Sequence, residues 1–492
     1  MASSTASNGR ALSPPGLPIA LDRAASFYGG GRVVTGGSPW GVARIKDAAL
    51  PQLAALRRAG RHGLTPDTAV GRALARQLLD RGLAHPVPPA RGGPHPVTVV
   101  VPAYGRTAEL ARCLDALRGL EVIVVDDCSP DPAAVRAISE AHGARLVRHA
   151  VNRGPAAART TGAALATTPL VAFVDSDCRP EEGWLDLLVP AFDDPQVAAV
   201  APRILPDVPY PPMGLLARYE AARSALDLGR EQAVVRPGAR VGFVPTATLV
   251  VRTDVLSKVT FDEELRLGED VDFVWRLHDH GLHVRYQPRA RVLHTPRLAW
   301  REALKRRHEY GTSAAALAER HPGRVAPARP SAWNLLTLGL LTHGRPGAAA
   351  LSTLTSAALL RRHLSDTPAA AELSASVVAQ GLVADSMALG LALRREWWPL
   401  GLLCLGAAPG SRTARAATAA MLAPVLAEWV ARRPPLDPVR WTALRCLDDL
   451  AYGTGVTASA WRHRALAPLL PKVGLPFVRR SAASRAKDSQ AV

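Results

Sequence analysis

The chain alternates short apolar runs with helical stretches between residues 97 and 174, and this pattern restricts its fold more than any other feature. Each apolar run is nearly continuous, which is typical of strands buried on both faces of a sheet. Strands that alternate with helices predict a parallel, doubly wound α/β sheet. Such sheets bind ligands beyond the carboxyl ends of their strands. The expected strands are 97–101, 122–125, 145–147 and 170–174, and the expected helices are 106–117, 133–142 and 155–166.

Acidic side chains follow two of these runs directly. Asp126 and Asp127 follow the second run, and Asp175 and Asp177 follow the fourth. Carboxylates gathered at one edge repel each other unless cations or hydrogen bonds offset the repulsion. The Asp-x-Asp pair suits Mg²⁺ or Mn²⁺, which completes its shell with phosphate and water. Asp126 or Asp127 is suited to accept from a base N–H or from ribose hydroxyls. A single aspartate is equally well explained as a helix cap, but several strand ends together favour a site.

The motifs of two common nucleotide-binding classes are absent from the sequence after these strands. No Gly-x-x-x-x-Gly-Lys-Ser/Thr loop follows them, which argues against an NTPase, and no Gly-x-Gly-x-x-Gly follows the first, which argues against a Rossmann dehydrogenase. The motifs instead resemble those of the family 2 glycosyltransferases with the GT-A fold, over about residues 95–300. The segments that carry this resemblance are VTVVVPAYGR, VIVVDDCSPD, NRGPAAARTTG, VAFVDSDC and GEDVDFVWRL. The resemblance implies a nucleotide-diphosphate sugar donor, a divalent metal and inversion of the anomeric centre.

The resemblance also implies which side chains bind the nucleotide sugar. Three of them follow the first strand, and Asp126 or Asp127 would contact uracil or ribose. Another segment, 152–159, would close over the nucleotide. The implied set is Pro102, Tyr104, Arg106, Asp126, Asp127, Asn152, Gly154, Arg159 and Asp175.

Metal and catalytic roles are implied for five positions, of which Asp175 belongs to the set above. Asp175 and Asp177 would form the metal motif, with Mg²⁺ or Mn²⁺ bound and Asp177 as the direct ligand. His294 matches a late histidine ligand, although a lone histidine after a β-prone run is also explained by a structural role. Asp270 would be the general base, with Glu269 as its neighbour. Acids at 269–272 are also explained as residues of a helix N-terminus, where they favour the dipole.

One segment departs from the pattern of the processive members of this family. Those members carry a Gln-x-x-Arg-Trp segment, whereas this chain has Lys305-Arg306-Arg307-His308-Glu309-Tyr310-Gly311. Synthesis of a long polymer is therefore not expected. Arg306 or Arg307 could still meet a diphosphate, and exposed arginines on a helix are the alternative.

Composition divides the chain into five segments. They are a disordered start at 1–15, a small winged-helix-like and PqqD-like module at 16–90, the GT-A domain at 95–330, a helical region at 331–470 and a basic tail at 471–492. A helix over 66–81 is expected to open at Thr65-Pro66-Asp67. The Ala- and Leu-rich helical region is either soluble or membrane-associated, and Trp397-Trp398 beside arginines resembles an interfacial anchor. Scattered cysteines favour the reducing, cytoplasmic face of a membrane.

The whole layout resembles that of the mycofactocin-system glycosyltransferases. This resemblance implies transfer of hexose, with UDP-glucose as the donor and β-1,4 linkages, onto a peptide-derived mycofactocin precursor. Residue spacing leaves UDP-galactose and GDP-mannose open as donors. A lipid-linked or cell-wall acceptor at the membrane is the alternative. The net charge of +18 would also suit a nucleic-acid-binding protein, but that reading gives no reason for acids at the strand ends.

Overall fold

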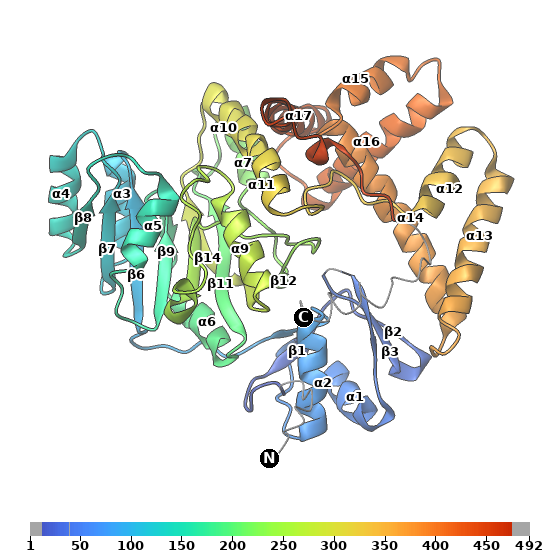
Figure 1. Ribbon diagram of the computed structural model, residues 1–492, viewed down its shortest axis with the longest axis horizontal. Coiled ribbons are helices and arrows are strands. Elements are labelled where there is room, and N and C mark those ends of the chain that lie inside the picture. The colour runs from blue at the N-terminus through green and yellow to red at the C-terminus, as the bar shows by residue number, and fades with distance from the viewer. Residues whose placement is uncertain (1–11, 39, 475–492) are drawn as a thin grey trace, which may run out of the picture.

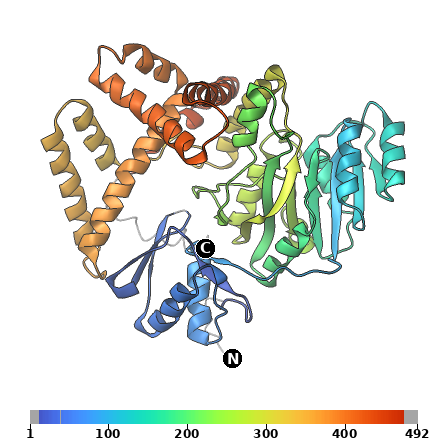
Figure 2. The same ribbon diagram turned by 180° about the vertical axis from the view of Figure 1, so that it is seen from behind.

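The computed structural model describes residues 12–38 and 40–474, which form three parts. A small module at the N-terminus lies below the other two parts in Figure 1, the sheet domain lies at the left, and the helical region lies at the right. Figure 2 shows the same three parts from behind. The expected disordered start and basic tail fall mostly outside the described residues. Within the described part of the start, the Ser13 amide donates to the Arg72 carbonyl at 3.2 Å.

A nine-stranded mixed sheet forms the centre of the sheet domain. Its parallel part contains β8, β7, β6 and β9, as the strand–helix alternation predicts. Strand β13 pairs with β9 in the antiparallel direction. Strands β10 and β12 each pair with β14, also in the antiparallel direction. The bounds are Val97–Ala103 (β6), Glu121–Asp126 (β7), Arg145–Arg148 (β8), Leu170–Val174 (β9), Cys178–Pro180 (β10), Val197–Pro206 (β11), Ala233–Val235 (β12), Thr248–Arg252 (β13) and His283–His294 (β14).

Helices cover both faces of this sheet, so its central strands are buried on both sides. Leu110 of α3 and Val135 of α4 belong to the core on one face. Ala156 of α5 and Val271 of α9 belong to the core on the other. The helices are Thr107–Ala116 (α3), Pro132–Ala141 (α4), Pro155–Ala163 (α5), Trp184–Leu188 (α6), Leu215–Ala222 (α7), Thr253–Leu256 (α8) and Glu269–Asp279 (α9).

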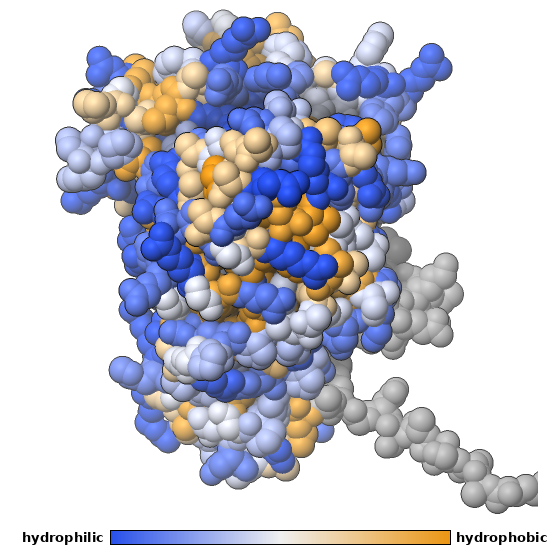
Figure 3. Space-filling view, turned by 90° about the vertical axis from the view of Figure 1, so that its left-hand side faces the viewer, coloured by the Kyte–Doolittle hydropathy of each residue, from blue (hydrophilic) through white to orange (hydrophobic). Residues whose placement is uncertain are grey.

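The edge strand β8 ends the sheet on the side where α4 lies. Its sequence, Arg145–Arg148, places an arginine at each end of two apolar residues. Charged residues on an edge strand discourage pairing with another chain. Figure 3 faces this side of the molecule, where hydrophilic side chains cover most of the surface and apolar areas lie among them.

The N-terminal module combines two small sheets with two helices around one core. Its helix α2 begins at Ala69, later than expected, because the hydroxyl of Thr68 accepts from the Gly71 amide at 3.0 Å. The expected cap at Thr65-Pro66-Asp67 is therefore wrong by one turn. The elements are Ile19–Leu21 (β1), Ser26–Tyr28 (β2), Val33–Gly36 (β3), Gly41–Arg44 (β4), Ala84–Pro86 (β5), Leu50–Ala59 (α1) and Ala69–Asp80 (α2).

Eight helices follow the sheet domain. One of them, α14, is long and apolar enough to cross a membrane by length and composition. The last, α17, packs along α10, and its Gly455 lies against Gly311 of α10. The bounds are Trp300–Thr312 (α10), Ala314–Arg320 (α11), Ala332–Thr342 (α12), Pro346–His363 (α13), Ala370–Arg394 (α14), Trp398–Ala407 (α15), Arg412–Arg432 (α16) and Pro438–Arg462 (α17).

The paired tryptophans that resembled a membrane anchor are bonded inside the protein. The Trp397 indole donates to the Leu469 carbonyl at 2.7 Å, and the Trp398 indole donates to Thr457 at 3.3 Å. The neighbouring Arg394 is buried and pairs with Asp449 of α17 at 2.9 Å. Arg394 and Trp398 therefore join the α14–α15 junction to α17, and Trp397 binds a carbonyl beyond the end of α17, while the expected interfacial anchor stays a prediction.

The three parts are joined in a closed circuit of contacts. Arg76 of the N-terminal module forms a buried ion pair with Asp194 of the sheet domain at 3.0 Å. Tyr28 of the same module donates to Ser376 of α14 at 2.9 Å. Arg307 of α10 binds Glu220 of α7 at 2.8 Å and also contacts Asp448 of α17. Each part therefore contacts the other two.

Candidate active site

Loops after β6, β7 and β9 form one rim of the sheet, as the topology requires. Pro102 lies half-buried in β6, and Tyr104 just beyond it has 55% of its surface exposed. Arg106 and Cys128, in the loops after β6 and β7, both have left-handed φ, 48° and 65°. This conformation is rare outside glycine and concentrates at functional sites. The strained loops therefore lie where the nucleotide is expected.

The two aspartates after β7 are buried and already hydrogen-bonded. Asp126 accepts from the Ser129 amide at 2.8 Å and pairs with Arg148. Asp127 accepts from His149 at 2.8 Å and from the Gly154 amide at 2.7 Å. A carboxylate has about four acceptor positions, so each retains capacity for one more donor.

Asn152 and Gly154 lie beside Asp127. The side-chain amide of Asn152 donates to the Asp127 carbonyl at 3.2 Å, and the Arg153 amide donates to the Asp127 carboxylate at 2.8 Å. These bonds fold the 149–154 loop against the end of β7. His149, which also contacts Thr161 at 2.9 Å, was not predicted; only its place after a strand could have indicated it.

Arg159 of α5 joins two acidic segments that are far apart in the sequence. Its guanidinium is buried and binds Asp175 at 2.7 Å and Glu269 at 3.0 Å. Burial acts to lower its pKa, but the charges of Asp175 and Glu269 outweigh burial and raise the pKa of Arg159 above its usual value. This cation offsets the repulsion between the end of β9 and the start of α9.

Asp270 lies next to this pair, in the first turn of α9. It follows Gly268, whose φ of +84° turns the chain sharply into the helix. Burial, and then the neighbouring charge of Glu269, raise the pKa of Asp270 to about 7. Its carboxylate accepts from the adjacent Val271 amide at 2.8 Å. A carboxylate with a pKa near neutrality is suited to general base catalysis.

Asp177 and His294 meet because β10 pairs with β14. Cys178 stands opposite His294 in the register. The Nε2 atom of His294 therefore lies 3.7 Å from a carboxylate oxygen of the preceding residue, Asp177. Arg106 also binds Asp177, at 3.1 Å. Burial, and then Arg106 and Arg297, lower the pKa of His294, which favours the neutral imidazole that ligates metals.

These residues fit a divalent ion that is shared with a diphosphate. Within residues 12–38 and 40–474, no group of three or more His, Cys, Asp or Glu side chains forms a complete metal site. Asp177 and His294 would supply two ligands, while Asp175 is bonded to Arg159. Mg²⁺ and Mn²⁺ commonly take one or two carboxylates and obtain the rest of their shell from phosphate and water.

A group of arginines lies beside Asp177. Burial, and then the charges of Arg306 and Arg106, lower the pKa of Arg297, so these three cations lie within reach of one another. Arg306 also contacts Glu309 at 3.4 Å. Arg297 was not predicted; its position three residues after His294 is the only signal in the sequence. Arg307 instead binds Glu220 and Asp448 and points away from this group.

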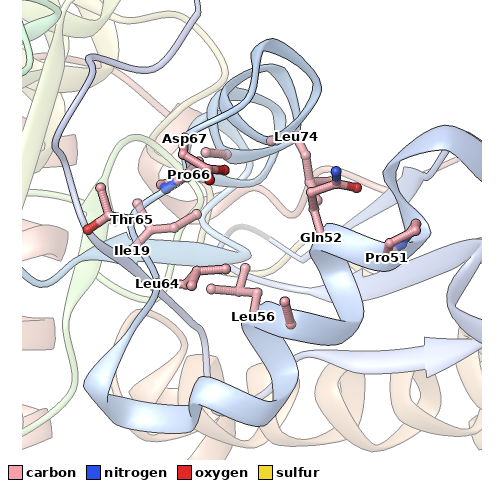
Figure 4. A pocket seen from close by; sticks show the side chains of 12 residues that line it. Ile19, Pro51, Gln52, Leu56, Leu64, Thr65, Pro66, Asp67 and Leu74 are labelled. Atoms are coloured by element: carbon pink, nitrogen blue, oxygen red, sulfur yellow. The ribbon is translucent and has the colours of Figure 1, made fainter.

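A separate cavity of about 320 Å³ lies in the N-terminal module, between α1, α2 and β1. Figure 4 shows the apolar side chains of Ile19, Leu56 and Leu64 around it, with Gln52 and Asp67 at its margin. The buried Oε1 of Gln52 has no hydrogen-bond partner. A buried acceptor without a donor is costly, so this cavity offers a place for a ligand that donates one.

Comparison with known proteins identifies the family. Residues 98–244 match the family described as Glycosyl transferase family 2. The chain is 38% identical over 473 residues to the Pre-mycofactocin glycosyltransferase of Mycobacterium tuberculosis, covering 94% of this chain and 98% of that protein. The chain belongs to this glycosyltransferase family. It is also 28% identical to Glycosyltransferase AglE of Haloferax volcanii, over 38% of this chain and 62% of that protein.

Solved structures of glycosyltransferases resemble the chain more distantly. The mannosyltransferase PcManGT from Pyrobaculum calidifontis, in complex with GDP-Man and Mn²⁺, is 21% identical with a TM-score of 0.41. The match covers 76% of this chain and 91% of that structure. The family membership and the α/β sheet with helices on both faces together identify the fold as GT-A-like.

Proposed function

We propose that the protein is an inverting hexosyltransferase that transfers glucose from UDP-glucose to the peptide-derived mycofactocin precursor, in successive β-1,4 linkages. Asp270, with its pKa raised to about 7 at the start of α9, is the observation that carries the chemistry. The identity of 38% along almost the whole length of a pre-mycofactocin glycosyltransferase supports the acceptor. The resemblance of the motifs to family 2 supports the donor and the stereochemistry.

In this proposal Asp270 removes the proton of the acceptor hydroxyl. The hydroxyl oxygen attacks the anomeric carbon, and the bond from that carbon to the diphosphate oxygen breaks on the opposite face. One displacement of this kind inverts the configuration. Arg159 binds Glu269 and Asp175 directly, whereas at Asp270 its charge only partly offsets the burial and the Glu269 charge that raise the pKa. Asp270 is therefore free to hold a proton, while Glu269 positions the helix start.

The departing diphosphate needs positive charge around it. Arg106 and Arg297 supply fixed cations beside Asp177, and the charge of Arg306 acts on Arg297. Asp177 and His294 would hold Mg²⁺ or Mn²⁺, with Asp175 close by, and the ion would supply further charge stabilisation on the leaving oxygens. Preorganised charges of this kind usually contribute most of the rate enhancement.

The nucleotide would lie across the loops after β6 and β7. Tyr104 is exposed there and presents a ring on which a base can stack. Asp126 or Asp127 would accept from the base or the ribose with its remaining acceptor position. Asn152 and Gly154 would act by holding the Asp127 loop in place.

We infer that the N-terminal module binds the peptide-derived part of the acceptor. Its cavity is apolar with an unpaired acceptor, Gln52 Oε1, which suits a small apolar group carrying one donor. Leu64→Arg, at the cavity wall, should raise KM for the acceptor and leave KM for the donor unchanged. An equal rise in both constants would contradict this role.

A transfer assay with the purified full chain tests the proposed function. UDP-glucose, UDP-galactose, UDP-N-acetylglucosamine and GDP-mannose are offered with Mn²⁺ or Mg²⁺, with and without the precursor, and products are weighed by mass spectrometry. Successive hexose additions to the precursor are expected from UDP-glucose alone. Slow donor hydrolysis without transfer would point to the alternative, a lipid-linked or cell-wall acceptor, and no reaction with any donor would overturn the proposal.

Two variants assign the residues in the same assay. Asp177→Ala should abolish metal-dependent turnover and leave the fold intact. Asp270→Asn should leave donor binding nearly unchanged and remove transfer. Glu264→Gln is the matched control, because that carboxylate lies ahead of α9 with 88% of its side chain exposed. Retained turnover in Asp177→Ala, or weakened donor binding with transfer spared in Asp270→Asn, would contradict the assignments.

A further inference from the structure

Helices α12, α13 and α15 expose leucines, whereas their buried residues are small or polar. In α13, Ala349, Ser352 and Ser356 are buried, while Leu351 and Leu354 are 65% and 67% exposed. This arrangement is the reverse of a water-soluble helix, whose apolar residues face the core. The fully buried side chains of α13 are thus small or polar, and two of its leucines are exposed.

The neighbouring helix α12 repeats this arrangement. Its buried residues are Asn334 and Thr337, and the Thr337 hydroxyl bonds to Ser352 of α13 at 3.0 Å. Leu336 and Leu341 of α12 are exposed. Small residues and hydroxyls that bond across a helix contact are typical of helices surrounded by lipid.

Helix α15 is the most extreme example. Its one buried residue is Gly401, where a Cβ would lie 2.2 Å from the Leu393 carbonyl of α14. The rest of this apolar helix presents its leucines outward. We name the outward side chains of α12, α13 and α15 the leucine face; it consists of Leu336, Leu341, Leu351, Leu354, Leu400, Leu402, Leu403 and Leu405.

We propose that the leucine face lies in one leaflet of a lipid bilayer with anionic headgroups. The two helical hairpins that carry it meet at their tips, because Gly344 between α12 and α13 lies against Arg412 at the start of α16. In Figures 1 and 2 these helices form the outer margin of the molecule, away from the catalytic sheet. Among the described residues, no other part of the chain covers these exposed leucines.

Positive charge at the ends of these helices favours a bilayer with anionic headgroups. Arg345, Arg361, Arg362 and Arg412 are exposed there, and none of them forms an ion pair with any acid in the described part of the chain. Arginines that flank an apolar face attract anionic headgroups. A water-soluble partner protein would need matching acids as well as an apolar surface, whereas an anionic bilayer supplies both features together.

The contacts at the two ends of α14 argue that the protein lies on the bilayer and does not cross it. Leu373 near its start packs against Tyr28 and Val33 of the N-terminal module. Arg394 at its end is bonded to Asp449 of α17. The module contacts the sheet domain through Arg76 and Asp194, and α17 contacts it through the Tyr219 hydroxyl of α7, which donates to Asp448 at 3.3 Å. If α14 crossed a bilayer, these two anchors would stand on opposite sides, which their shared contact with one domain forbids.

The other apolar helices are too short to span. Helices α12 and α15 contain 11 and 10 residues, or about 15–17 Å at ~1.5 Å per residue. The hydrocarbon core measures about 30 Å. They can therefore enter one leaflet but cannot reach the other.

Flotation of the purified full chain with vesicles tests this proposal independently of the acceptor. Vesicles of phosphatidylcholine alone are compared with equal parts phosphatidylcholine and phosphatidylglycerol. Binding to the anionic vesicles is expected, weakened by salt, and alkaline carbonate should release the protein. The variant L351Q/L354Q/L402Q/L403Q should bind the vesicles at least about tenfold more weakly, because the buried apolar area sets interfacial affinity. It should still hydrolyse UDP-glucose.

Two further variants separate the contributions. R361Q/R362Q should lose the preference for phosphatidylglycerol and the salt dependence. V70Q/V439Q, on exposed apolar residues of α2 and α17, is the matched control and should bind as the unchanged chain does. Failure to float with either vesicle, unchanged binding of the leucine variant, or carbonate resistance would overturn the proposal. So would a dimer that the leucine substitutions dissociate, since a second copy would then be the occupant.

Discussion

The carboxylates of the catalytic rim differ in what compensates their charge. Backbone amides and His149 stabilise Asp127, and Arg159 stabilises both Asp175 and Glu269. Asp270 receives no comparable compensation, so its pKa is raised to about 7 by burial and by Glu269. Pairs of carboxylates whose environments separate their pKa values often divide the acid–base work between them. The division between Glu269 and Asp270 can be tested by titration.

The first prediction concerns the pH dependence of transfer. Because Asp270 must be deprotonated to act as a base, kcat/KM should fall as the pH decreases below about 7. Glu269→Gln removes the like charge that raises the pKa of Asp270, so the acidic limb should move to lower pH. Initial rates of transfer from pH 5 to pH 9 measure this shift. A limb that moves upward, or does not move, would mean that another group sets the profile.

The second prediction concerns stability, with the sign fixed by the same pKa. The pKa of Asp270 is about 7 in the folded protein and 3.8 in the unfolded chain, so the folded state binds more protons between these values. Stability contributed by this site therefore decreases as the pH rises through that window. Asp270→Asn should raise the free energy of unfolding by roughly 2–4 kcal/mol at pH 8 and by less at pH 5. Urea unfolding at both pH values measures this increase in the free energy of unfolding. A larger increase at pH 5 than at pH 8 would contradict the prediction.

Among the elements, the parallel strands and the acidic strand ends were predictable because local patterns encode them. Continuous apolar runs mark buried strands, and motifs mark the carboxylates. Helix α17 was not singled out, because Arg445, Asp448 and Asp449 interrupt its apolar pattern. In the folded chain these charges pair with Glu428 and with Arg307 and Arg394. Partners so distant in the sequence leave no local signal, and the same holds for Arg297 in the site.

The third prediction concerns the crossing of α10 and α17. A Cβ at Gly455 would lie 1.9 Å from the His308 carbonyl of α10. Overpacking usually costs 1–3 kcal/mol, so Gly455→Ala should destabilise by about 2 kcal/mol. Gly339→Ala in α12 is the matched control, because nothing lies within 4 Å of its added Cβ and alanine favours a helix by about 0.5–1 kcal/mol. Thermal unfolding compares them, and equal midpoints would contradict the close crossing.

At the scale of the whole molecule, buried ionic contacts join the three parts. Arg76 and Asp194 have side-chain exposures of 3% and 1%, although they belong to different parts. Buried ion pairs are a poor measure of net stability, since both ions lose their hydration. Removing one partner is far more costly than replacing both, so the interface should respond asymmetrically to substitution.

The fourth prediction follows from that asymmetry. Arg76→Ala leaves Asp194 buried without its cation and should cost about 3–5 kcal/mol, whereas Arg76→Met with Asp194→Leu should cost much less. Arg118→Ala is the control, because its pair with Asp115 is solvent-exposed and such pairs contribute about 0–1 kcal/mol. Denaturant unfolding of the three variants measures this order. A double variant that is as unstable as Arg76→Ala would show that packing, and not the unpaired charge, dominates.

The contact between Tyr28 and Ser376 spans 348 positions of the chain. Translation adds about 5–20 residues per second, so the N-terminal module waits about 20–70 seconds on the ribosome before α14 is made. Throughout that interval the side of Tyr28 and Val33 that Leu373 later covers is open to water and to other nascent chains. We expect a chaperone to bind this exposed surface during synthesis. Slower translation should lengthen the time for which the chaperone is needed.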